Sequence, residues 1–356
     1  MIEHDFFLVD LMKTGEVLQY RKFLEMSKLP NHKITCEQEY YAVDQHDLDS
    51  YTRKFCLVHI IVGIHKNQEF VQDMLRKVDR LIAKGFKIIL VCPWESEHNL
   101  RDYNYHNNHR SAFLEIFKDR EYFIWSGRAS WFWFHMYEKH KGTTFEEIAE
   151  KKYNFLYLNK EPRPHRKKLF ERLHPLTNSL VSFLKLDDPI RLPPVYELPW
   201  VDQKNYPLRG YDQDIYQKPY QDSFCSIVSE SNDGSDEIFI TEKVWKAIIN
   251  KHLFIVHGNH RVLHCLRNYG FKTFVGHIDE SYDEIIDQEQ KINSLQSIIK
   301  SMDYDSLAKA YNDTVQIRNH NFDNFFKVES LVNCINDTVL GFLEFFDSGK
   351  IPSRKS

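Results

Sequence analysis

The feature that most constrains this chain is a strand–helix–strand pattern in its first half. Residues 55–63 form a nearly continuous apolar run, β-branched toward its end, which is typical of a strand buried on both faces of a parallel sheet. Residues 67–84 place apolar side chains on one face at helical spacing, and Gly85 follows as a stop signal. Residues 87–92 form a second apolar run. Two strands and a helix within about 40 residues predict a right-handed βαβ unit.

The same alternation returns in the second half of the chain, whereas the first 50 residues show no strong period. The pattern predicts an α/β fold of two Rossmann-like domains, residues 1–150 and 151–356, that face a ligand cleft. The C-terminal helix is expected to pack back on the N-terminal domain. Thr144 and Glu147 have the spacing of a capping box, which predicts a short helix there. Strands are expected at 153–158, 223–229, 253–257 and 272–275, and helices at 241–250, 261–268 and 324–346.

Composition narrows the class of protein. The 356 residues are 42% hydrophobic, which is ample for packed cores, and 47 Lys and Arg against 51 Asp and Glu give a net charge of −4. That balance argues against a globally basic protein that coats nucleic acid. The apolar runs are too short to cross a bilayer, the N-terminus lacks signal-peptide features, and the six cysteines are scattered without a Cys-x-x-Cys pair. We therefore expect a cytoplasmic enzyme with reduced thiols and no membrane span.

An aromatic block at residues 131–137, Trp-Phe-Trp-Phe-His-Met-Tyr, has two interpretations. It can form a stacking platform for a sugar or a base, or it can be a buried helix between layers. We favour the buried helix, because dense aromatic residues more often fill a core than bind a ligand.

The strongest local signal is a polar, Gly-containing loop after the strand 223–229, followed by a helix that opens at Thr241-Glu242-Lys243. A helix N-terminus offers free N–H groups and a partial positive charge, so it favours a phosphate-like anion. Lys243 in the first turn does not suit the helix dipole, but it suits a diphosphate partner. Glu230 and Glu242 are candidates to accept hydrogen bonds from ribose or sugar hydroxyls. The alternative is an ordinary capped surface helix.

A second basic signal precedes this one. Residues 151–172 contain eight Lys and Arg against two Glu, and the strand that opens this segment ends at Asn159. We expect one arginine, Arg166 or else Arg163, to lie opposite Lys243 and complete a diphosphate clamp. The other basic residues are expected to form a solvated helix face.

These two segments resemble the donor-binding region of the α1,3-fucosyltransferase family. Glu230 matches the motif glutamate, Phe239 the aromatic, and residues 240–243 the Val/Ile-Thr-Glu-Lys run. Asn232 is assigned to the same site, although this chain has Ser-Glu-Ser-Asn where the family has Phe-Glu-Asn-Ser. The resemblance covers about 40 residues well. It implies a two-domain, GT-B-type, inverting and metal-independent glycosyltransferase with GDP-fucose as donor.

The catalytic base is expected on the N-terminal domain. Glu95 is the first candidate and Glu97 the second, because both follow the strand 87–92 at its C-terminal end, where open α/β sheets bind ligands. We identify no Asp-x-Asp loop of the kind that a metal-dependent transferase uses, and no metal site is predicted. The histidines considered as ligands lack the helical i, i+4 spacing with an acidic partner: His98, His106, His109 and His135. The sequence also lacks Gly-x-Gly-x-x-Gly, Walker and Gly-x-Ser-x-Gly motifs.

Together these patterns predict a glycosyltransferase that moves a sugar, fucose by the resemblance, from a nucleotide-diphosphate donor to a hydroxyl of a glycan. Residues 151–356 would bind the nucleotide sugar and residues 1–150 the acceptor. No cofactor beyond the sugar nucleotide is expected. Two alternatives remain: a glycosyltransferase that acts on nucleic acid, which the acidic balance disfavours, and a non-catalytic protein that binds sugar nucleotides or glycans.

Overall fold

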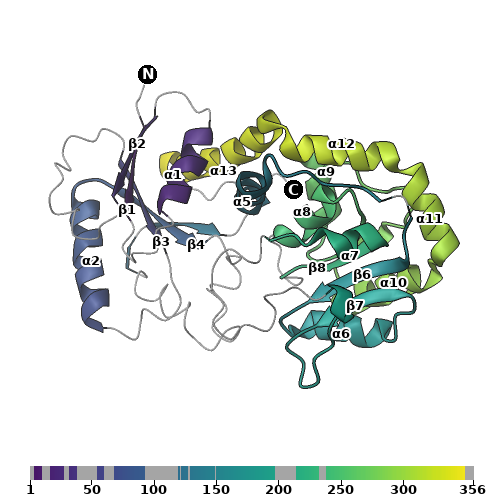
Figure 1. The fold of residues 1–356 in the computed structure, drawn as a ribbon. Helices are drawn as coiled ribbons and strands as arrows, with labels where there is room; N and C mark the ends of the chain where they lie inside the picture. Colours follow the sequence, from purple (N-terminus) through teal and green to yellow (C-terminus); the bar gives the residue numbers. More distant parts are fainter. Residues whose placement is uncertain are drawn as a thin grey trace. The chain divides into compact units, whose positions relative to one another are not determined.

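The fold is mixed α/β with parallel sheets, as the sequence predicts (Figure 1). The computed structural model describes residues 4–9, 17–27, 32–37, 54–59, 68–92, 119–120, 122–126, 129–148, 150–196, 214–231 and 238–348. Contacts divide the chain into two compact units. The first comprises residues 1–131 and 331–356, and the second comprises residues 132–330. Each unit is described by itself, and the cleft expected between two domains stays a prediction.

The first unit contains a parallel sheet with the strand order β2-β1-β3-β4-β5. Helix α2 has the buried apolar face that its spacing predicts, and it stops at Gly85, whose φ of +83° is left-handed and suits glycine. β1, β2 and α1 lie in the first 50 residues, where the sequence showed no period. The elements are β1 His4–Val9, α1 Val17–Met26, β2 His32–Glu37, β3 Lys54–His59, α2 Gln68–Ala83, β4 Lys87–Cys92 and β5 Tyr122–Ser126.

The second unit contains a parallel sheet with the order β7-β6-β8-β9. The chain passes from β6 to its neighbour β7 on one side, and then returns to place β8 on the other side of β6. The order therefore reverses between β6 and β8, and this switch point is where open α/β sheets bind ligands. Every side chain of β8 and β9 is buried, which explains their uninterrupted apolar sequence signal. The strands are β6 Tyr153–Asn159, β7 Ser179–Phe183, β8 Ser223–Ser229 and β9 Leu253–His257.

Helices cover the second sheet, with α10 packed against α6 and α12 against α8 (Figure 1). The predicted last helix is α13, and its Thr338 hydroxyl lies 2.7 Å from that of Ser130, within the first unit. In the described part of the chain, none of the helices has both the length and the apolar character needed to cross a membrane. The helices are α5 Ala129–His140, α6 Pro164–Leu173, α7 Gln217–Asp222, α8 Glu242–Ile249, α9 Val262–Asn268, α10 Gln288–Ser301, α11 Tyr304–Asp313, α12 Val315–Phe326 and α13 Val328–Ser348.

The aromatic block forms the buried helix α5, which confirms the favoured interpretation. Trp133 is fully buried in the second unit. The centroid of its ring lies 5.3 Å from the ring centroid of Trp245 and 4.9 Å from that of Phe271. Its indole Nε1 donates to the carbonyl of Phe325 at 2.9 Å. The indole therefore joins α5, α8 and α12 through packing and through a satisfied polar atom.

Two local predictions are wrong. Residues 272–275 form no strand, because side chains bind their backbone: Asn321 accepts from the Lys272 N–H, and Glu280 accepts from the Phe274 N–H. Thr144 and Glu147 open no helix. The Glu147 carboxylate instead accepts hydrogen bonds from Tyr311 and Arg318 of the C-terminal helices. In both places, contacts with residues elsewhere in the sequence override the local sequence pattern.

The Trp133 contacts predict a large stability cost for truncation. Trp133→Ala should lower the free energy of unfolding by about 3–5 kcal/mol, because it removes a buried aromatic side chain and leaves a cavity. Urea denaturation followed by circular dichroism measures the change. Lys141→Ala, at the exposed end of the same helix, should stay within about 0.5 kcal/mol of wild type. Equal midpoints for Trp133→Ala and wild type would contradict the assigned core.

Candidate anion-binding site

The candidate site lies at the switch point of the second sheet, where two strand ends meet two helix starts. β6 ends at Asn159 and leads to α6, whose N-cap is Arg163. β8 ends at Ser229 and is followed by Glu230. Helix α8 begins at Glu242 with Thr241 as its N-cap, as the sequence predicts. The two segments singled out in the sequence therefore converge at one edge of one sheet.

Glu230 holds this edge together, because its backbone and side chain both bind neighbouring elements. Its N–H donates to the carbonyl of His257 at the end of β9, at 2.8 Å. Its carbonyl accepts from Nε and Nη2 of Arg166 at 3.1 and 3.0 Å, and from Nε2 of His165 at 3.0 Å. Its carboxylate accepts from the Thr241 N–H at 3.0 Å and from the Thr241 hydroxyl. One buried residue thus joins β8, β9, α6 and α8.

Gly258 allows Glu230 to lie this deep. A Cβ atom at position 258 would lie 3.3 Å from the Glu230 Cβ and 3.4 Å from a methyl group of Val262. Both distances are at or below ordinary van der Waals contact, so a side chain here would press on Glu230. A glycine is used where the backbone of one strand end must approach another closely.

Three cations converge on the residue after Glu230. Nη1 of Arg163 donates to the carbonyl of Ser231 at 2.6 Å. The Ser231 hydroxyl accepts from Nη2 of Arg166 at 3.2 Å and from Nζ of Lys243 at 3.3 Å. Lys243 also donates to the hydroxyl of Thr241 at 2.9 Å and to the carboxylate of Glu242 at 2.8 Å. Arg166 and Lys243, expected on opposite sides of an anion, therefore contact the same oxygen atom.

The charges at this edge favour an anion. Burial is the largest influence on Glu230 and raises the pKa of its carboxyl, against the opposing effects of Lys243 and Thr241. Burial also raises the pKa of Glu242, but Lys243 and Lys246 outweigh it and hold that pKa below its ordinary value. Burial and then Arg163 lower the pKa of Arg166, which remains charged because a guanidinium does not lose its proton in proteins. Three cations therefore face at most two carboxylates.

A row of polar side chains crosses the sheet beside these cations. Ser229 is in register with His257, and continuing the β6–β8 register from Leu156 and Ser226 places Asn159 beside Ser229. Asn159 and His257 are buried, and neither amide atom of Asn159 and neither ring nitrogen of His257 has a hydrogen-bond partner among the described residues. Burial, with His165, holds the pKa of His257 well below 6.5, so its imidazole is neutral. Buried polar atoms without partners are costly, which favours contact with a ligand or water.

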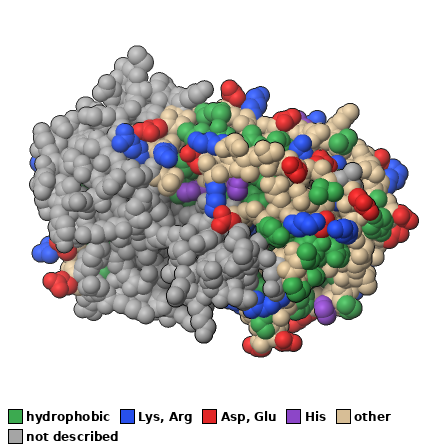
Figure 2. Space-filling view, in the orientation of Figure 1, with side chains coloured by type: hydrophobic (Ala, Val, Ile, Leu, Met, Phe, Trp, Pro, Cys, Tyr) green, Lys and Arg blue, Asp and Glu red, His purple; other side chains and the backbone are tan. Residues whose placement is uncertain are grey.

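The basic segment 151–172 does not act as one unit. Lys168 and Arg172 both pair with Glu289 and are substantially exposed. Lys151 is instead buried, and its ammonium donates to the carbonyl of Tyr220 at 3.2 Å. On the face shown in Figure 2, Lys and Arg side chains of the described residues are interspersed with Asp and Glu. The charges of Lys168 and Arg172 are therefore neutralised at the surface and do not reach the site.

Some predicted site residues lie outside the described part of the chain, and some residues at the site were not predicted. Glu95, Glu97 and Asn232 lie outside the described residues, so their roles stay predictions. Sequence reasoning missed Ser231 and the pair His165 and His257, whose rings lie 5.4 Å apart. Ser231 and His165 each adjoin a residue already singled out, and that adjacency is the signal that could have found them.

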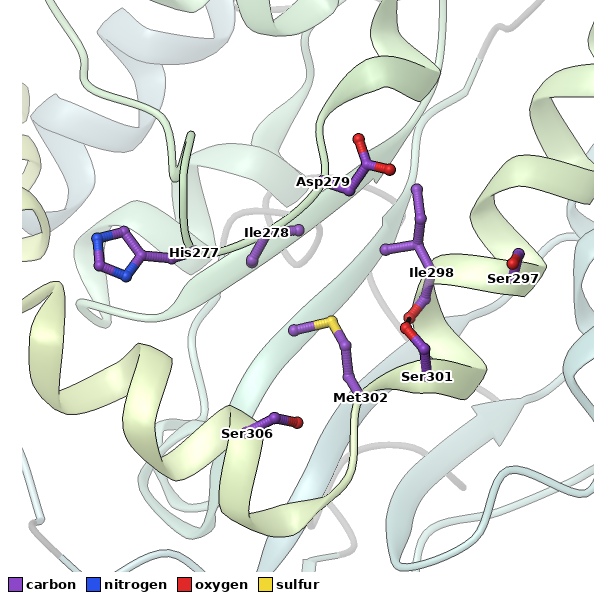
Figure 3. A pocket seen from close by; sticks show the side chains of 8 residues that line it. All are labelled: His277, Ile278, Asp279, Ser297, Ile298, Ser301, Met302 and Ser306. Atoms are coloured by element: carbon purple, nitrogen blue, oxygen red, sulfur yellow. Dashed lines mark hydrogen bonds between the residues drawn. The ribbon is translucent and has the colours of Figure 1, made fainter.

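Other features of the described residues do not join this site. They contain no group of three or more His, Cys, Asp or Glu side chains that could hold a metal. A pocket of about 320 Å³ is lined by the turn at residues 277–279, by Ser297 of α10, by Met302 just after α10 and by Ser306 of α11, among others (Figure 3). The described residues that line it include neither lysine nor arginine.

Comparisons with known proteins give a distant structural likeness. No family model matches the sequence. No curated protein matches it either. A solved structure described as a crystal structure of alpha1,3-fucosyltransferase is similar, with a TM-score of 0.41 and 8% sequence identity, over 88% of this chain and 80% of that chain. A likeness at this level does not place the chain in that family.

The Thr241 contacts predict a pH-dependent stability effect. Thr241→Val removes the hydroxyl that donates to the buried Glu230 carboxylate, and should lower the free energy of unfolding by about 1–3 kcal/mol at pH 7. Because the pKa of Glu230 is raised in the folded state, its ionisation lowers stability as the pH rises. The loss should therefore be smaller at pH 5, where more of the carboxyl is protonated.

Urea denaturation of both proteins at pH 5 and pH 7 measures this difference. Thr241→Ser retains the hydroxyl and is the matched control, expected to recover most of the lost stability. If valine and serine at position 241 give the same unfolding midpoint, the Thr241–Glu230 hydrogen bond does not stabilise the fold.

Proposed function

We propose that this chain is a glycosyltransferase that transfers a sugar from a nucleotide-diphosphate donor to a hydroxyl of a glycan acceptor, with inversion and without a metal. The observation that carries the proposal is the convergence of Arg163, Arg166 and Lys243 on Ser231 at the switch point of the second sheet. In this proposal residues 151–356 bind the donor and residues 1–150 bind the acceptor.

The cations suit a reaction in which a diphosphate leaves. Negative charge grows on the diphosphate as its bond to the sugar breaks, and fixed positive groups stabilise that charge most in the transition state. Arg166 is held by the Glu230 carbonyl, and Lys243 by Thr241 and Glu242, so neither cation has to reorganise during the reaction. The N-terminus of α8 adds a partial positive charge.

The geometry refines the roles expected for the acidic and amide residues. The Glu230 carboxylate is fully buried and accepts from Thr241 through both oxygens, so we assign it to positioning α8, in place of binding a sugar hydroxyl. Glu242 anchors Lys243 and remains a candidate for a ribose or sugar hydroxyl. Asn159, with its unpartnered amide at the end of β6, is a candidate donor contact, and Asn232 is retained as a further one.

The proposed donor sugar and the proposed catalytic base are both inferred from the sequence. The resemblance in residues 229–243 implies GDP-fucose as donor, and Glu95 or Glu97 as the carboxylate that deprotonates the acceptor hydroxyl. An inverting transfer needs such a base, because the hydroxyl attacks the anomeric carbon as the diphosphate leaves from the opposite face.

Two other functions use the same cations. A glycosyltransferase that acts on nucleic acid would bind duplex or single-stranded DNA with strong salt dependence. A non-catalytic protein would bind the sugar nucleotide without turning it over. Donor hydrolysis or transfer by the purified protein separates an enzyme from a binding protein, and a salt-dependent mobility shift with DNA would favour a nucleic-acid acceptor.

Removing one cation should weaken nucleotide binding. Lys243→Ala should reduce affinity for a nucleoside diphosphate by about 1.5–3 kcal/mol, the scale of a hydrogen bond to a charged group. Arg166→Lys, which retains a positive charge while losing the bidentate geometry, should also weaken binding without removing the fold. A thermal-shift screen with GDP, UDP, CMP and dTDP selects the nucleotide, and isothermal titration calorimetry then measures each affinity.

The matched controls are Lys168→Ala and Arg172→Ala. Both residues lie on α6, and both pair with Glu289 at the surface. Their variants should bind the nucleotide as wild type does. If Lys243→Ala and Lys168→Ala have equal affinities, the assigned anion site is wrong.

The predicted base is tested by its kinetics. Glu95→Gln retains size and polarity but removes basicity, so it should lower kcat by about 10²–10⁴-fold with little change in donor affinity. Glu97→Gln, measured beside it, decides which carboxylate acts. Wild-type turnover by both variants would place the base elsewhere, and a loss of donor affinity in place of kcat would place Glu95 in the donor pocket.

A further inference from the structure

The Ser231 hydroxyl occupies an unusual electrostatic position. It is a neutral group, yet its oxygen accepts from the guanidinium of Arg166 and from the ammonium of Lys243. These two cations come from α6 and α8, which follow different strands, and like charges at this range repel. The hydroxyl oxygen is the atom on which both converge.

The contacts to this hydroxyl are the longest made by either cation. They measure 3.2 Å from Arg166 and 3.3 Å from Lys243. The other hydrogen bonds of these two side chains measure 2.8–3.1 Å and go to the Glu230 carbonyl, the Thr241 hydroxyl and the Glu242 carboxylate. Those partners are fixed by the fold, so the Ser231 hydroxyl is the acceptor that the site can exchange at least cost.

An ionised acceptor would bind this point more strongly than a hydroxyl does. Hydrogen bonds in which donor and acceptor are both ionised are short, about 2.7–2.9 Å, whereas the contacts to the neutral Ser231 hydroxyl measure 3.2 and 3.3 Å. A phosphate oxygen carries the negative charge that the serine oxygen lacks. It can also accept from both cations at once.

We infer that the Ser231 hydroxyl marks the position of a donor phosphate oxygen and acts as a positioning residue. It keeps Arg166 and Lys243 directed at one point, and a phosphate oxygen takes its place when the donor binds. Arg163 remains on the Ser231 carbonyl and Arg166 remains on the Glu230 carbonyl. This inference rests on the proposed function and adds to it the atom that the diphosphate replaces.

A negatively charged side chain at residue 231 should therefore occupy the proposed phosphate position and compete with the ligand. Ser231→Asp places a carboxylate between the two cations, and Ser231→Asn places a side chain of the same size without charge. Inorganic pyrophosphate is the first probe, because its binding needs no base or sugar, and the nucleoside diphosphate that wild type binds best is the second. Calorimetry gives the affinities, and thermal unfolding shows whether each variant folds.

Ser231→Asp should lower the affinity for both probes by about 30-fold or more, since it supplies the contact that the ligand would make. Ser231→Asn should stay within about threefold of wild type on the same reasoning. The melting temperature of the aspartate variant should be at least that of the asparagine variant, because its carboxylate pairs with the buried Arg166 and the partly buried Lys243. Ser297→Asp, an exposed serine on α10, controls for added charge and should bind both probes as wild type does.

Equal affinities for the aspartate and asparagine variants would overturn the inference, and so would an aspartate variant that melts below the asparagine variant. The proposed function fails separately. If wild type binds pyrophosphate, Ser231→Asp does not, and no sugar nucleotide is turned over, the anion site stands and the transferase does not. If wild type transfers sugar and the two Ser231 variants bind alike, only the role of Ser231 is wrong.

Discussion

The second unit depends on the burial of one carboxylate at the end of one strand. Glu230 is removed from water, which alone would make an ionised side chain costly. The cost is offset because the Thr241 N–H and hydroxyl both donate to it, and because Lys243 lies close enough to lower its pKa. The start of α8 is thereby fixed to the end of β8, and the guanidinium of Arg166 is fixed to the same residue through its carbonyl.

This arrangement explains why three consecutive residues at the start of α8 are polar and different from one another. Thr241 satisfies Glu230, Glu242 holds the ammonium of Lys243, and Lys243 then reaches the Ser231 hydroxyl. A lysine in the first turn opposes the helix dipole, so its position costs stability. The adjacent Glu242 carboxylate reduces that cost. A cation at this helix start is what the proposed anion site would use.

The sequence predicted the elements whose apolar residues follow a simple pattern and missed elements without one. β8 and β9 were predicted with their observed bounds because every one of their side chains is buried, so an apolar run marks each strand. β1 and β2 lie in a segment without a clear period and were not predicted. Residues 272–275 had strand composition, but Asn321 and Glu280 satisfy their backbone from distant positions, which no local pattern reveals.

In the candidate site, too, the sequence indicates the chemical type of a residue but not its three-dimensional contacts. Charge type and a helix start were enough to predict that Arg166 and Lys243 would meet, because cations and a helix N-terminus both favour the same kind of ligand, an anion. The role of Glu230 could not be derived in this way. A carboxylate that binds a sugar and one that caps a helix have the same sequence, and only the close approach at Gly258 and the two Thr241 hydrogen bonds separate them. Ser231 was missed for the converse reason: a lone hydroxyl has no chemical signature until two cations from separate helices are directed at it.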